Sequence, residues 1–431
     1  MKTPRILTSR IAAAAALIFT PALHAADRFW IDSLGGAFDI SGNWSATDGG
    51  VGGATVPAAA DVANFTLNNT YTVTFNAAAT NLALDVENGN VTFDLNGLSY
   101  TATSNFGAAF IGNVSGQTGR LTIRDGAVGV DTNGDDLFIS TATGSTGFLT
   151  VTTGGILGTA ALRPDFFIGS NGAGTLTVND NGRINGRTFA IGLVSGATGT
   201  MTITGPNAVA DFTSVADVGQ AGTGTLSVTN GGTLTNAGIV TLGSELGADG
   251  TATVSGIGSS WTMSSTASIG NFGDGTLTIS AGGLVSSAGI VTLSTNGTGV
   301  GTATVTGAGS RWNVASTQTI GQTGLGVMTV SSGGQVVSSA NANLGLNAGS
   351  EGRVTVTGTG SQWTLGSQII VGNGGTGDLT VSAGGEVSAA SVAFGNNSTG
   401  RGVATVTGTG SKLTTTGNVT VANVGDGTLC R

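Results

Sequence analysis

The chain has 431 residues, including 77 glycines, 5 prolines and 1 cysteine, and only 9% of its residues are charged. Abundant glycine without a Gly-X-Y triplet excludes collagen, and the many Val, Ile, Leu and Thr residues exclude an intrinsically disordered chain. The formal net charge of −9 argues against nucleic-acid binding, which needs a basic surface. A single cysteine, Cys430, excludes a small domain held together by disulfides.

The first 25 residues have the features of a signal peptide. Lys2, Arg5 and Arg10 form a positive n-region, Ile11–Phe19 form an apolar segment, and Leu23–Ala25 offer a cleavage site. The apolar segment is too short for a good transmembrane helix, and we predict no transmembrane segment elsewhere in the chain. Cleavage removes 3 of the 14 basic residues and no acidic ones, so the mature chain carries a net charge of −12 (11 − 23).

Residues 26–105 are predicted to form an N-terminal β cap. Trp30 and Trp44 lie near its start, and strand-like runs follow at Tyr71–Phe75, Leu82–Val86 and Val91–Leu95. None of these segments fits the repeat that follows. Because the end of a stack of repeats exposes unpaired backbone and apolar core, an atypical terminal unit is expected there.

A regular repeat fills residues 106–431. Four segments can be overlaid with almost no gaps, namely Gly250–Trp261, Gly301–Trp312, Gly352–Trp363 and Gly402–Leu413. Their first glycines are 51, 51 and 50 residues apart (301 − 250, 352 − 301, 402 − 352). A second set of the Gly-Thr-Leu-Thr-Val type lies between them and begins at Gly224, Gly275, Gly326 and Gly377. Degenerate copies open at Gly119, Gly147, Gly174 and Gly199. Self-similarity at a fixed period of this size indicates a repeat architecture.

Each repeat contains three short strand-like runs, as in Thr225–Val228, Thr233–Asn236 and Ile239–Leu242. Three strands and three turns in about 25 residues correspond to one rung of a parallel β-helix, whose strands pair with those of the adjacent rungs. We therefore predict an all-β fold: a right-handed parallel β-helix, or solenoid, with an N-terminal cap. Counting these repeat openings together with a last one at Gly427 gives thirteen rungs and a rod roughly 60 Å long. The alternative is a β-propeller with 51-residue blades, which the half-repeat fits poorly.

The alternation of Gly-Thr-Leu-Thr-Val-x-x-Gly-Gly with Gly-Thr-Ala-Thr-Val-x-Gly-x-Gly-Ser-x-Trp resembles the repeat of autotransporter passengers and of PEP-CTERM-associated surface proteins. The resemblance covers most of residues 27–429. The opening segment with Trp30, Trp44, Pro57, Asp61 and Phe65 also resembles the segment that often precedes those repeats. The resemblance implies a secreted, surface-associated β-helix of a Gram-negative bacterium, and it supplies no catalytic residues to carry over.

The C-terminus departs from both kinds of protein. An autotransporter continues into a membrane barrel, and a PEP-CTERM protein ends in a Pro-Glu-Pro motif, an apolar helix and basic residues. This sequence instead stops three residues into a repeat, where Cys430 and Arg431 replace the expected pattern. We therefore expect a truncated gene product that lacks its C-terminal anchor or barrel.

Three tryptophans, Trp261, Trp312 and Trp363, recur in every second rung. An exposed file of aromatic rings could hold sugar rings, whereas buried tryptophans would fill the core of the wider rungs. Leu413 and Ala210 occupy the matching positions of other copies, which favours the packing interpretation.

Thr-x-Thr pairs recur along the repeats at Thr202/Thr204, Thr251/Thr253, Thr276/Thr278, Thr302/Thr304, Thr355/Thr357 and Thr405/Thr407. On a flat parallel face they would form a hydroxyl lattice of the kind that some β-helical ice-binding proteins use. The favoured interpretation is simpler, because Thr is a good solvent-facing strand residue and many polar positions differ between rungs.

Charged residues gather in the degenerate early rungs. One set comprises Arg124, Asp125, Asp131, Asp135 and Asp136, and a second comprises Arg163, Asp165, Asp180, Arg183 and Arg187. Clustered carboxylates with Arg or Ca²⁺ are what β-helical polysaccharide lyases and glycosidases need. The mature chain has no histidine and no recurring carboxylate pair, so solvated turn residues are the favoured interpretation.

The sequence thus predicts an exported surface or extracellular passenger with a structural or adhesin-like role and no catalysis. We assign no catalytic, cofactor-binding or metal-binding residues and expect no cofactor. The expected partners are host or matrix surfaces or glycans, and not nucleic acid. The alternative is a carbohydrate-active enzyme with its cleft across the rungs of residues 119–190, an analogy at the level of the fold.

Overall fold

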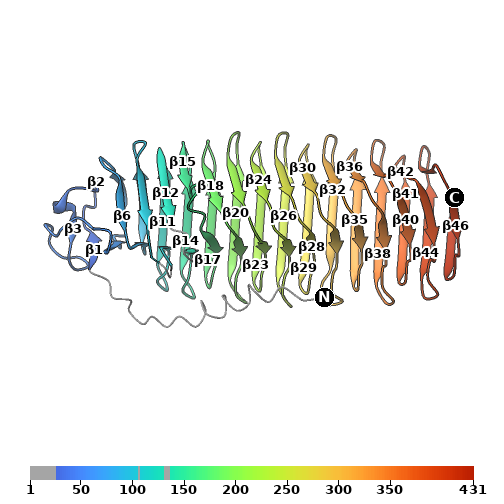
Figure 1. Cartoon of the computed structure of the whole chain (residues 1–431), viewed down its shortest axis with the longest axis horizontal. Coiled ribbons are helices and arrows are strands. Elements are labelled where there is room, and N and C mark those ends of the chain that lie inside the picture. The colour runs from blue at the N-terminus through green and yellow to red at the C-terminus, as the bar shows by residue number, and fades with distance from the viewer. Residues whose placement is uncertain (1–25, 105–106, 131–135) are drawn as a thin grey trace.

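The computed structural model describes residues 26–104, 107–130 and 136–431. The predicted signal peptide, Asp131 and Asp135 lie outside the described residues. The described chain is a rod of stacked turns, with the N-terminal segment at one end and residue 431 at the other (Figure 1). Three long sheets, A, B and C, run along the rod. The predicted all-β parallel solenoid is confirmed.

One turn of the stack visits the three sheets in the order B, C, A. In a typical turn, Thr223–Thr229 (β23) lies in sheet B, Thr233–Asn236 (β24) in sheet C and Val240–Leu242 (β25) in sheet A. Each strand pairs in parallel with the equivalent strand of the next turn, as β23 does with Asp249–Ser255 (β26). From Gly119 to residue 427, twelve steps cover 308 residues (427 − 119), which is about 26 residues per turn.

Sheet B has 16 described strands. They are β2 (Gly36–Ala37), β5 (Thr70–Thr74), β8 (Gly89–Asp94), β11 (Thr118–Arg124), β14 (Thr146–Val151), β17 (Ala173–Val178), β20 (Thr198–Thr204), β23, β26, β29 (Asp274–Ser280), β32 (Gly301–Thr306), β35 (Leu325–Ser331), β38 (Glu351–Thr357), β41 (Thr376–Ser382), β44 (Arg401–Thr407) and β47 (Asp426–Cys430).

Sheet C has 14 described strands, most of them four residues long. They are β6 (Ala79–Asn81), β9 (Ser99–Ala102), β12 (Gly126–Val130), β15 (Gly155–Leu157), β18 (Arg183–Gly186), β21 (Val209–Phe212), β24, β27 (Ser260–Met263), β30 (Leu284–Ser287), β33 (Arg311–Val314), β36 (Gln335–Ser338), β39 (Gln362–Leu365), β42 (Glu386–Ala389) and β45 (Lys412–Thr415).

Sheet A has 17 described strands, mostly of three or four residues. They are β1 (Asp27–Trp30), β3 (Trp44–Ser45), β4 (Val62–Phe65), β7 (Ala83–Val86), β10 (Ala109–Ile111), β13 (Asp136–Ile139), β16 (Asp165–Ile168), β19 (Phe189–Ile191), β22 (Ala216–Val218), β25, β28 (Ala267–Ile269), β31 (Val291–Leu293), β34 (Gln318–Ile320), β37 (Ala342–Leu344), β40 (Gln368–Val371), β43 (Ser391–Phe394) and β46 (Val419–Val421). A short 3-10 helix, Ser41–Asn43, precedes β3.

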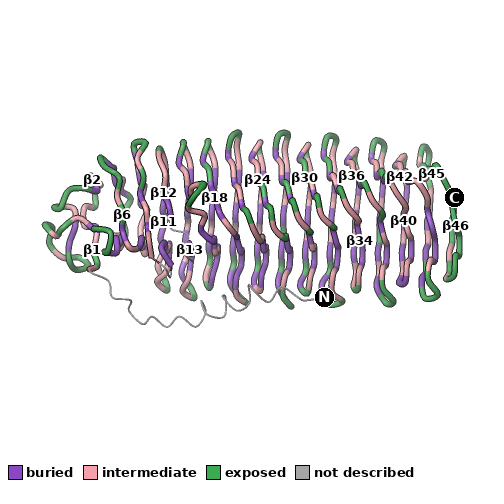
Figure 2. Tube along the Cα trace, in the orientation of Figure 1, coloured by how far each residue is buried: buried purple, intermediate pink, exposed green. Residues whose placement is uncertain are grey.

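The core is a column of apolar side chains inside the three sheets. Alternate residues of each sheet B strand point inward, as Leu226 and Val228 of β23 do, and both are fully buried. Figure 2 shows buried residues along the strands and exposed residues at the turn tips. The glycine at the start of the repeat strands of sheet B is required by close packing. A Cβ on Gly250 would lie 2.1 Å from the Val218 carbonyl oxygen and 2.3 Å from the Gly243 nitrogen.

Two kinds of turn alternate between sheets B and C. Ser259 ends the longer kind, and its Oγ accepts a hydrogen bond from the Gly231 N–H of the shorter turn before it, at 3.0 Å. The same Oγ donates to the carbonyl oxygen of Ser255 at 2.8 Å. Ser310, Ser361 and Ser411 repeat the contact with Gly282, Gly333 and Gly384. The structural unit is therefore a pair of turns, which explains the sequence period of about 51 residues.

The N-terminal segment closes one end of the rod. β1 pairs with β3 in antiparallel fashion, whereas it pairs in parallel with β4. Trp30 and Trp44 are fully buried, with ring centroids 5.2 Å apart in an edge-to-face arrangement. Each indole N–H finds a backbone acceptor at 2.8 Å. Buried aromatic groups and an antiparallel strand thus cover apolar surface that an open end of the stack would expose.

Stacked turns also reach into the segment 26–105 that the sequence predicts as a cap. β5 pairs in parallel with β8, and β8 with β11, while β6 pairs in parallel with β9. β5 lacks the opening glycine, and β8 opens with Gly89, the register partner of Gly119. Gly89 lies 30 residues before Gly119 (119 − 89) rather than about 26, so the periodicity does not reveal these turns. Register in a sheet depends on the pattern of inward apolar residues, and Tyr71, Val73 and Val91 keep that pattern.

Candidate functional site

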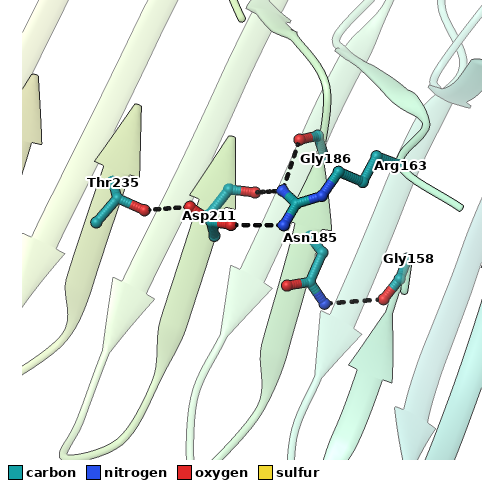
Figure 3. Close-up of polar contacts among 6 residues, drawn as sticks. All are labelled: Gly158, Arg163, Asn185, Gly186, Asp211 and Thr235. Atoms are coloured by element: carbon teal, nitrogen blue, oxygen red, sulfur yellow. Dashed lines mark hydrogen bonds and ion pairs between the residues drawn. The ribbon is translucent and has the colours of Figure 1, made fainter. Parts of the chain in front are cut away.

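Arg163 joins three turns on the outer side of sheet C. It lies in the loop between β15 and β16, and its Nη1 donates to the carbonyl oxygens of Gly186 and Asp211, each at 3.3 Å. Its Nη2 donates to Oδ2 of Asp211 at 2.7 Å (Figure 3). The other carboxylate oxygen of Asp211 accepts a hydrogen bond from Thr235 of β24. We call Arg163, Asp211 and Thr235 the sheet C clasp.

The clasp is a charge-compensated structural contact. Partial burial opposes ionisation of Asp211, but the hydrogen bond from Thr235 and the pairing with Arg163 hold its pKa below the usual value. Asn185 anchors the start of the same loop, because its Nδ2 donates to the carbonyl oxygen of Gly158 at 3.0 Å. A carboxylate with both oxygens engaged in this way is poorly suited to abstract or supply a proton.

A second ion pair joins Asp165 and Arg187. Arg187 Nε donates to Asp165 Oδ1 at 2.7 Å, and Nη2 contacts the other carboxylate oxygen. These hydrogen bonds raise the pKa of the Arg187 guanidinium, and the charge of Asp136 adds to the effect. Asp136 is the register partner of Asp165 in sheet A. Of the second charged set, Asp165 and Arg187 therefore form an ion pair, whereas Arg163 pairs with Asp211, which lies outside that set.

The remaining charged candidates are dispersed. Asp125 and Asp180 occupy turn positions with φ of +52° and +44°, a conformation that Asp tolerates better than most residues. Arg124 pairs with Asp94 of the preceding turn at 2.7 Å. Arg183 is exposed at the start of β18. In the described ranges no group of three or more His, Cys, Asp or Glu side chains could hold a metal ion.

The three repeat tryptophans are fully buried. Trp261 and Trp312 both align with Val285, which lies between them in sheet C. Trp312 Nε1 donates to Ser287 Oγ at 3.2 Å, and Trp363 Nε1 to Gln318 Oε1 at 3.2 Å. The packing interpretation is confirmed, and an exposed aromatic file for sugar rings is wrong, because the side chains point into the core.

The outer face of sheet B carries an in-register array of hydroxyl groups. Thr202 aligns with Thr177 and Ser227, whereas Thr251 aligns with Thr225. The Thr202/Thr204 pair is therefore shifted by one outward position from the Thr251/Thr253 pair. The true equivalents of Thr251 and Thr253 are Thr200 and Thr202.

Two acidic residues that the sequence did not single out lie in the outward column of sheet A. Burial and the charge of Glu87 raise the pKa of Asp85 to about 8, although Asn113 donates to its Oδ2 at 2.7 Å. Burial also raises the pKa of Asp217 to about 7, opposed by a hydrogen bond with Thr241. Outward positions normally face solvent, so the sequence carries no signal for this burial.

A stack of phenylalanines separates these two acids along sheet A. Phe110, Phe138 and Phe167 are register partners, with ring centroids 5.5 and 5.0 Å apart and nearly parallel planes. Because the rings cover one another's faces, they stabilise successive turns and leave mainly ring edges to solvent. Asp85 and Asp217 lie beyond the two ends of this stack, so they do not form a carboxylate pair.

Two open hollows mark the outer face of sheet B. One of about 280 Å³ is lined by residues that include Arg353, Thr355 and Asp378, and one of about 410 Å³ by Asn69, Arg120 and their neighbours. Neither hollow includes a member of the sheet C clasp or the Asp165–Arg187 pair. Among the helices of the described residues, none is long and apolar enough to cross a membrane.

No protein-family model matches the chain. The chain is 33% identical over 226 residues to the uncharacterized lipoprotein YdeK of Escherichia coli (strain K12), covering 50% of this chain and 17% of that protein. It therefore spans less than a fifth of that relative. The chain is also similar to the crystal structure of a TibC-catalyzed hyper-glycosylated TibA55-350 fragment, with 18% identity and a TM-score of 0.39 over 87% of this chain and 93% of that fragment.

Proposed function

We propose that this protein is exported to the cell surface or the extracellular space of a Gram-negative bacterium. There it acts as an extended structural or adhesin-like β-helix without catalysis. The predicted signal peptide and the resemblance of the repeats to autotransporter passengers and PEP-CTERM-associated proteins support this proposal. The similarity of half the chain to a protein described as a lipoprotein is consistent with a surface location.

The observation that carries the proposal is the continuity of the rod. Parallel pairing proceeds turn by turn through sheet B from β5 to β47, and the outward residues of each sheet recur at a spacing of about 4.8 Å. Such a surface offers many equivalent positions along its length rather than one enclosed pocket. Arg163, Asp165, Arg187 and Asp211, which an enzyme would need free, are engaged in cross-turn pairs.

The partners that fit this surface are host or matrix surfaces or glycans. With a mature net charge of −12 (11 − 23), the surface repels nucleic acid and other polyanions. Repeated weak contacts along a rigid rod add up through effective concentration when the partner is itself repetitive. A fibrous matrix protein or a neutral polysaccharide meets that condition.

Two measurements test the proposal. In the native host, protease added to intact cells should degrade the protein, while a cytoplasmic marker survives. The purified mature chain should bind members of a panel of matrix proteins and neutral glycans in a length-dependent manner. Protection from protease in intact cells would contradict the location, and no binding across the panel would contradict the adhesin-like role.

The absence of catalysis needs its own test, because Asp136 and Asp165 are neighbours in sheet A. We expect no release of reducing ends or unsaturated products from acidic and neutral polysaccharides. Product formation that an Asp136→Asn/Asp165→Asn double variant abolishes, with its solenoid intact, would establish the carbohydrate-active alternative. An Asp249→Asn variant, altered at an exposed position in β26, is the matched control.

A further inference from the structure

The outer face of sheet B holds an unbroken central column of hydroxyl groups through fourteen turns. Each member is the register partner of the next. The column consists of Thr72, Thr92, Thr122, Thr150, Thr177, Thr202, Ser227, Thr253, Thr278, Thr304, Thr329, Thr355, Thr380 and Thr405. No position along it is charged or apolar.

Five consecutive turns extend this column into a two-dimensional lattice. In β20, β23, β26, β29 and β32, all three outward positions after the opening glycine are Thr or Ser. They are Thr200, Thr202 and Thr204; Thr225, Ser227 and Thr229; Thr251, Thr253 and Ser255; Thr276, Thr278 and Ser280; and Thr302, Thr304 and Thr306. We call these fifteen residues the hydroxyl lattice.

The need for a good strand residue does not explain the lattice. In the first outward column, turns outside the lattice accept Arg120, Phe148, Val327, Arg353 and Asp378. The strand geometry there therefore tolerates aromatic, aliphatic and charged side chains. Thr nevertheless occupies that column in all five lattice turns, which indicates that hydroxyl groups are needed on this surface for a reason other than strand formation.

The spacing of the lattice follows from sheet geometry. Neighbouring strands lie about 4.8 Å apart, and outward residues two positions apart on a strand are separated by roughly 6.7 Å. Oxygen atoms on the faces of an ice crystal recur at distances of this size in two directions. The lattice carries no charged side chain, so it presents a regular array of uncharged hydroxyls and methyl groups.

The hydroxyls of the first and central columns are available for water. Within the described part of the chain, no protein hydrogen bond engages the side-chain hydroxyl of Thr251, of Thr253 or of their equivalents in the lattice. In the third column, by contrast, hydroxyls bond each other in pairs, as Thr229 does with Thr204 at 3.0 Å and Ser280 with Ser255 at 3.0 Å. Thr is also stiff at χ1, which lowers the entropy cost of ordering its hydroxyl.

We propose that the hydroxyl lattice is an ice-binding surface, whose ligand is the ordered water of an ice crystal. Each strand pairs in parallel register with its neighbours, so the outward columns stay aligned from turn to turn. The fifteen lattice positions are uncharged, and the exposed Asp249 and Asp274 lie beside the first column, just before the opening glycines of β26 and β29. Water molecules bound at the two free columns would share the periodicity of the crystal. The inference stands apart from the adhesin-like role, since it concerns one face and a different ligand.

The test is growth of ice in a solution of the purified mature chain. We expect faceted crystals, a gap between the melting and freezing points, and slowed recrystallisation. Thr253→Tyr, which places a bulky ring at the centre of the lattice, should remove more than half of the freezing gap. Thr262→Tyr, on an exposed outward position of β27 in sheet C, is the matched control and should change nothing. Circular dichroism must show the same β content in all three proteins.

Ice growth indistinguishable from that in an equal concentration of an inert protein would overturn the proposal. An equal loss in the Thr262→Tyr control would also overturn it, because the effect would then not belong to this face. If Thr253→Tyr instead abolished binding to a glycan or matrix protein and ice growth was never affected, the face would belong to the adhesin-like role. If Thr253→Tyr lost its effect on ice growth but still bound the glycan or matrix protein, the ice-binding proposal would be supported and the adhesin-like role would not be contradicted.

Discussion

The turns from β10 to β22 and those from β23 to β44 share three sheets but are held together by different contacts. The first group, which we call the irregular region, varies in turn length and uses long side chains that reach across turns, such as Arg163 to Asp211 and Arg187 to Asp165. The second group, the regular region, uses short turns, buried tryptophans and the Ser259-type contacts. Where the repeat is regular, backbone pairing, buried core side chains and the serine contacts of the turns hold successive turns together. Where it is not, individual charged and aromatic contacts compensate.

The largest expected effect is in the regular region. Trp312→Ala should lower the free energy of unfolding by about 3–5 kcal/mol, because a fully buried indole leaves a cavity. Contacts in a solenoid are between neighbouring turns, so hydrogen exchange should accelerate most in β30, β33 and β36. Trp312→Phe should lower the free energy of unfolding by less, because the phenyl ring fills part of the cavity. A loss under about 1 kcal/mol in Trp312→Ala would show that the regular region does not depend on its tryptophans.

The second largest expected effect concerns Asp217 in β22, at the boundary between the two regions, and the pH dependence of stability. Its pKa of about 7 exceeds the ordinary value of 3.8, so the folded state holds the proton more tightly than the unfolded chain. The contribution of Asp217 to the free energy of unfolding is therefore greatest in acid and falls as the pH rises from about 4 through 7. Asp217→Asn removes this charge and should raise the free energy of unfolding at pH 8.5 by on the order of 2–4 kcal/mol.

Urea unfolding of both proteins at pH 5 and pH 8.5 measures the difference. The two curves should converge toward the acidic end and separate toward the alkaline end. Asp249→Asn, at an exposed position, is the control and should leave the pH profile of the parent protein unchanged. If Asp217→Asn kept the full pH dependence, the burial of this carboxyl would not contribute to it.

The smallest effect tests the irregular region. Arg163→Ala removes the sheet C clasp, but the pair is partly exposed, with 22% of the Arg163 side chain and 37% of that of Asp211 accessible. The expected loss of stability is no more than about 1 kcal/mol. Limited proteolysis should nevertheless cut faster within residues 158–164. Arg353→Ala, which removes an exposed pair within one strand, should not change that cleavage, and unchanged cleavage in Arg163→Ala would mean that the clasp does not fix the loop.

Much of the fold could be predicted because the repeat is periodic. The recurring glycines, the alternation of inward Leu and Val with outward Thr, and the Trp positions all reflect local rules of strand geometry. The stacked turns before residue 105 could not be predicted in this way, because Tyr71–Phe75 lacks the opening glycine and Gly89 lies 30 residues before Gly119 (119 − 89), outside the regular period.

The side-chain contacts were harder to predict than the strands. Arg163 and Asp165 are close in sequence, yet Arg163 pairs with Asp211, 48 residues away. In a solenoid, residues one turn apart become neighbours about 4.8 Å apart, so partners depend on turn lengths that differ in the irregular region. The same uncertainty of register hid the hydroxyl lattice, since Thr202/Thr204 and Thr251/Thr253 look equivalent by motif and are not.

The contact between Ser259 and Gly231 limits how this protein can change its length. Duplication or deletion of two turns, about 51 residues, places every such serine next to a glycine N–H and preserves the pattern. Removal of one turn brings two turns of the same kind together. The cross-turn hydrogen bond from the glycine N–H to the serine Oγ is then lost at the junction, which costs free energy. Longer and shorter forms of the rod should therefore differ by whole pairs of turns, so the length of the coding sequence should change in steps of about 51 codons.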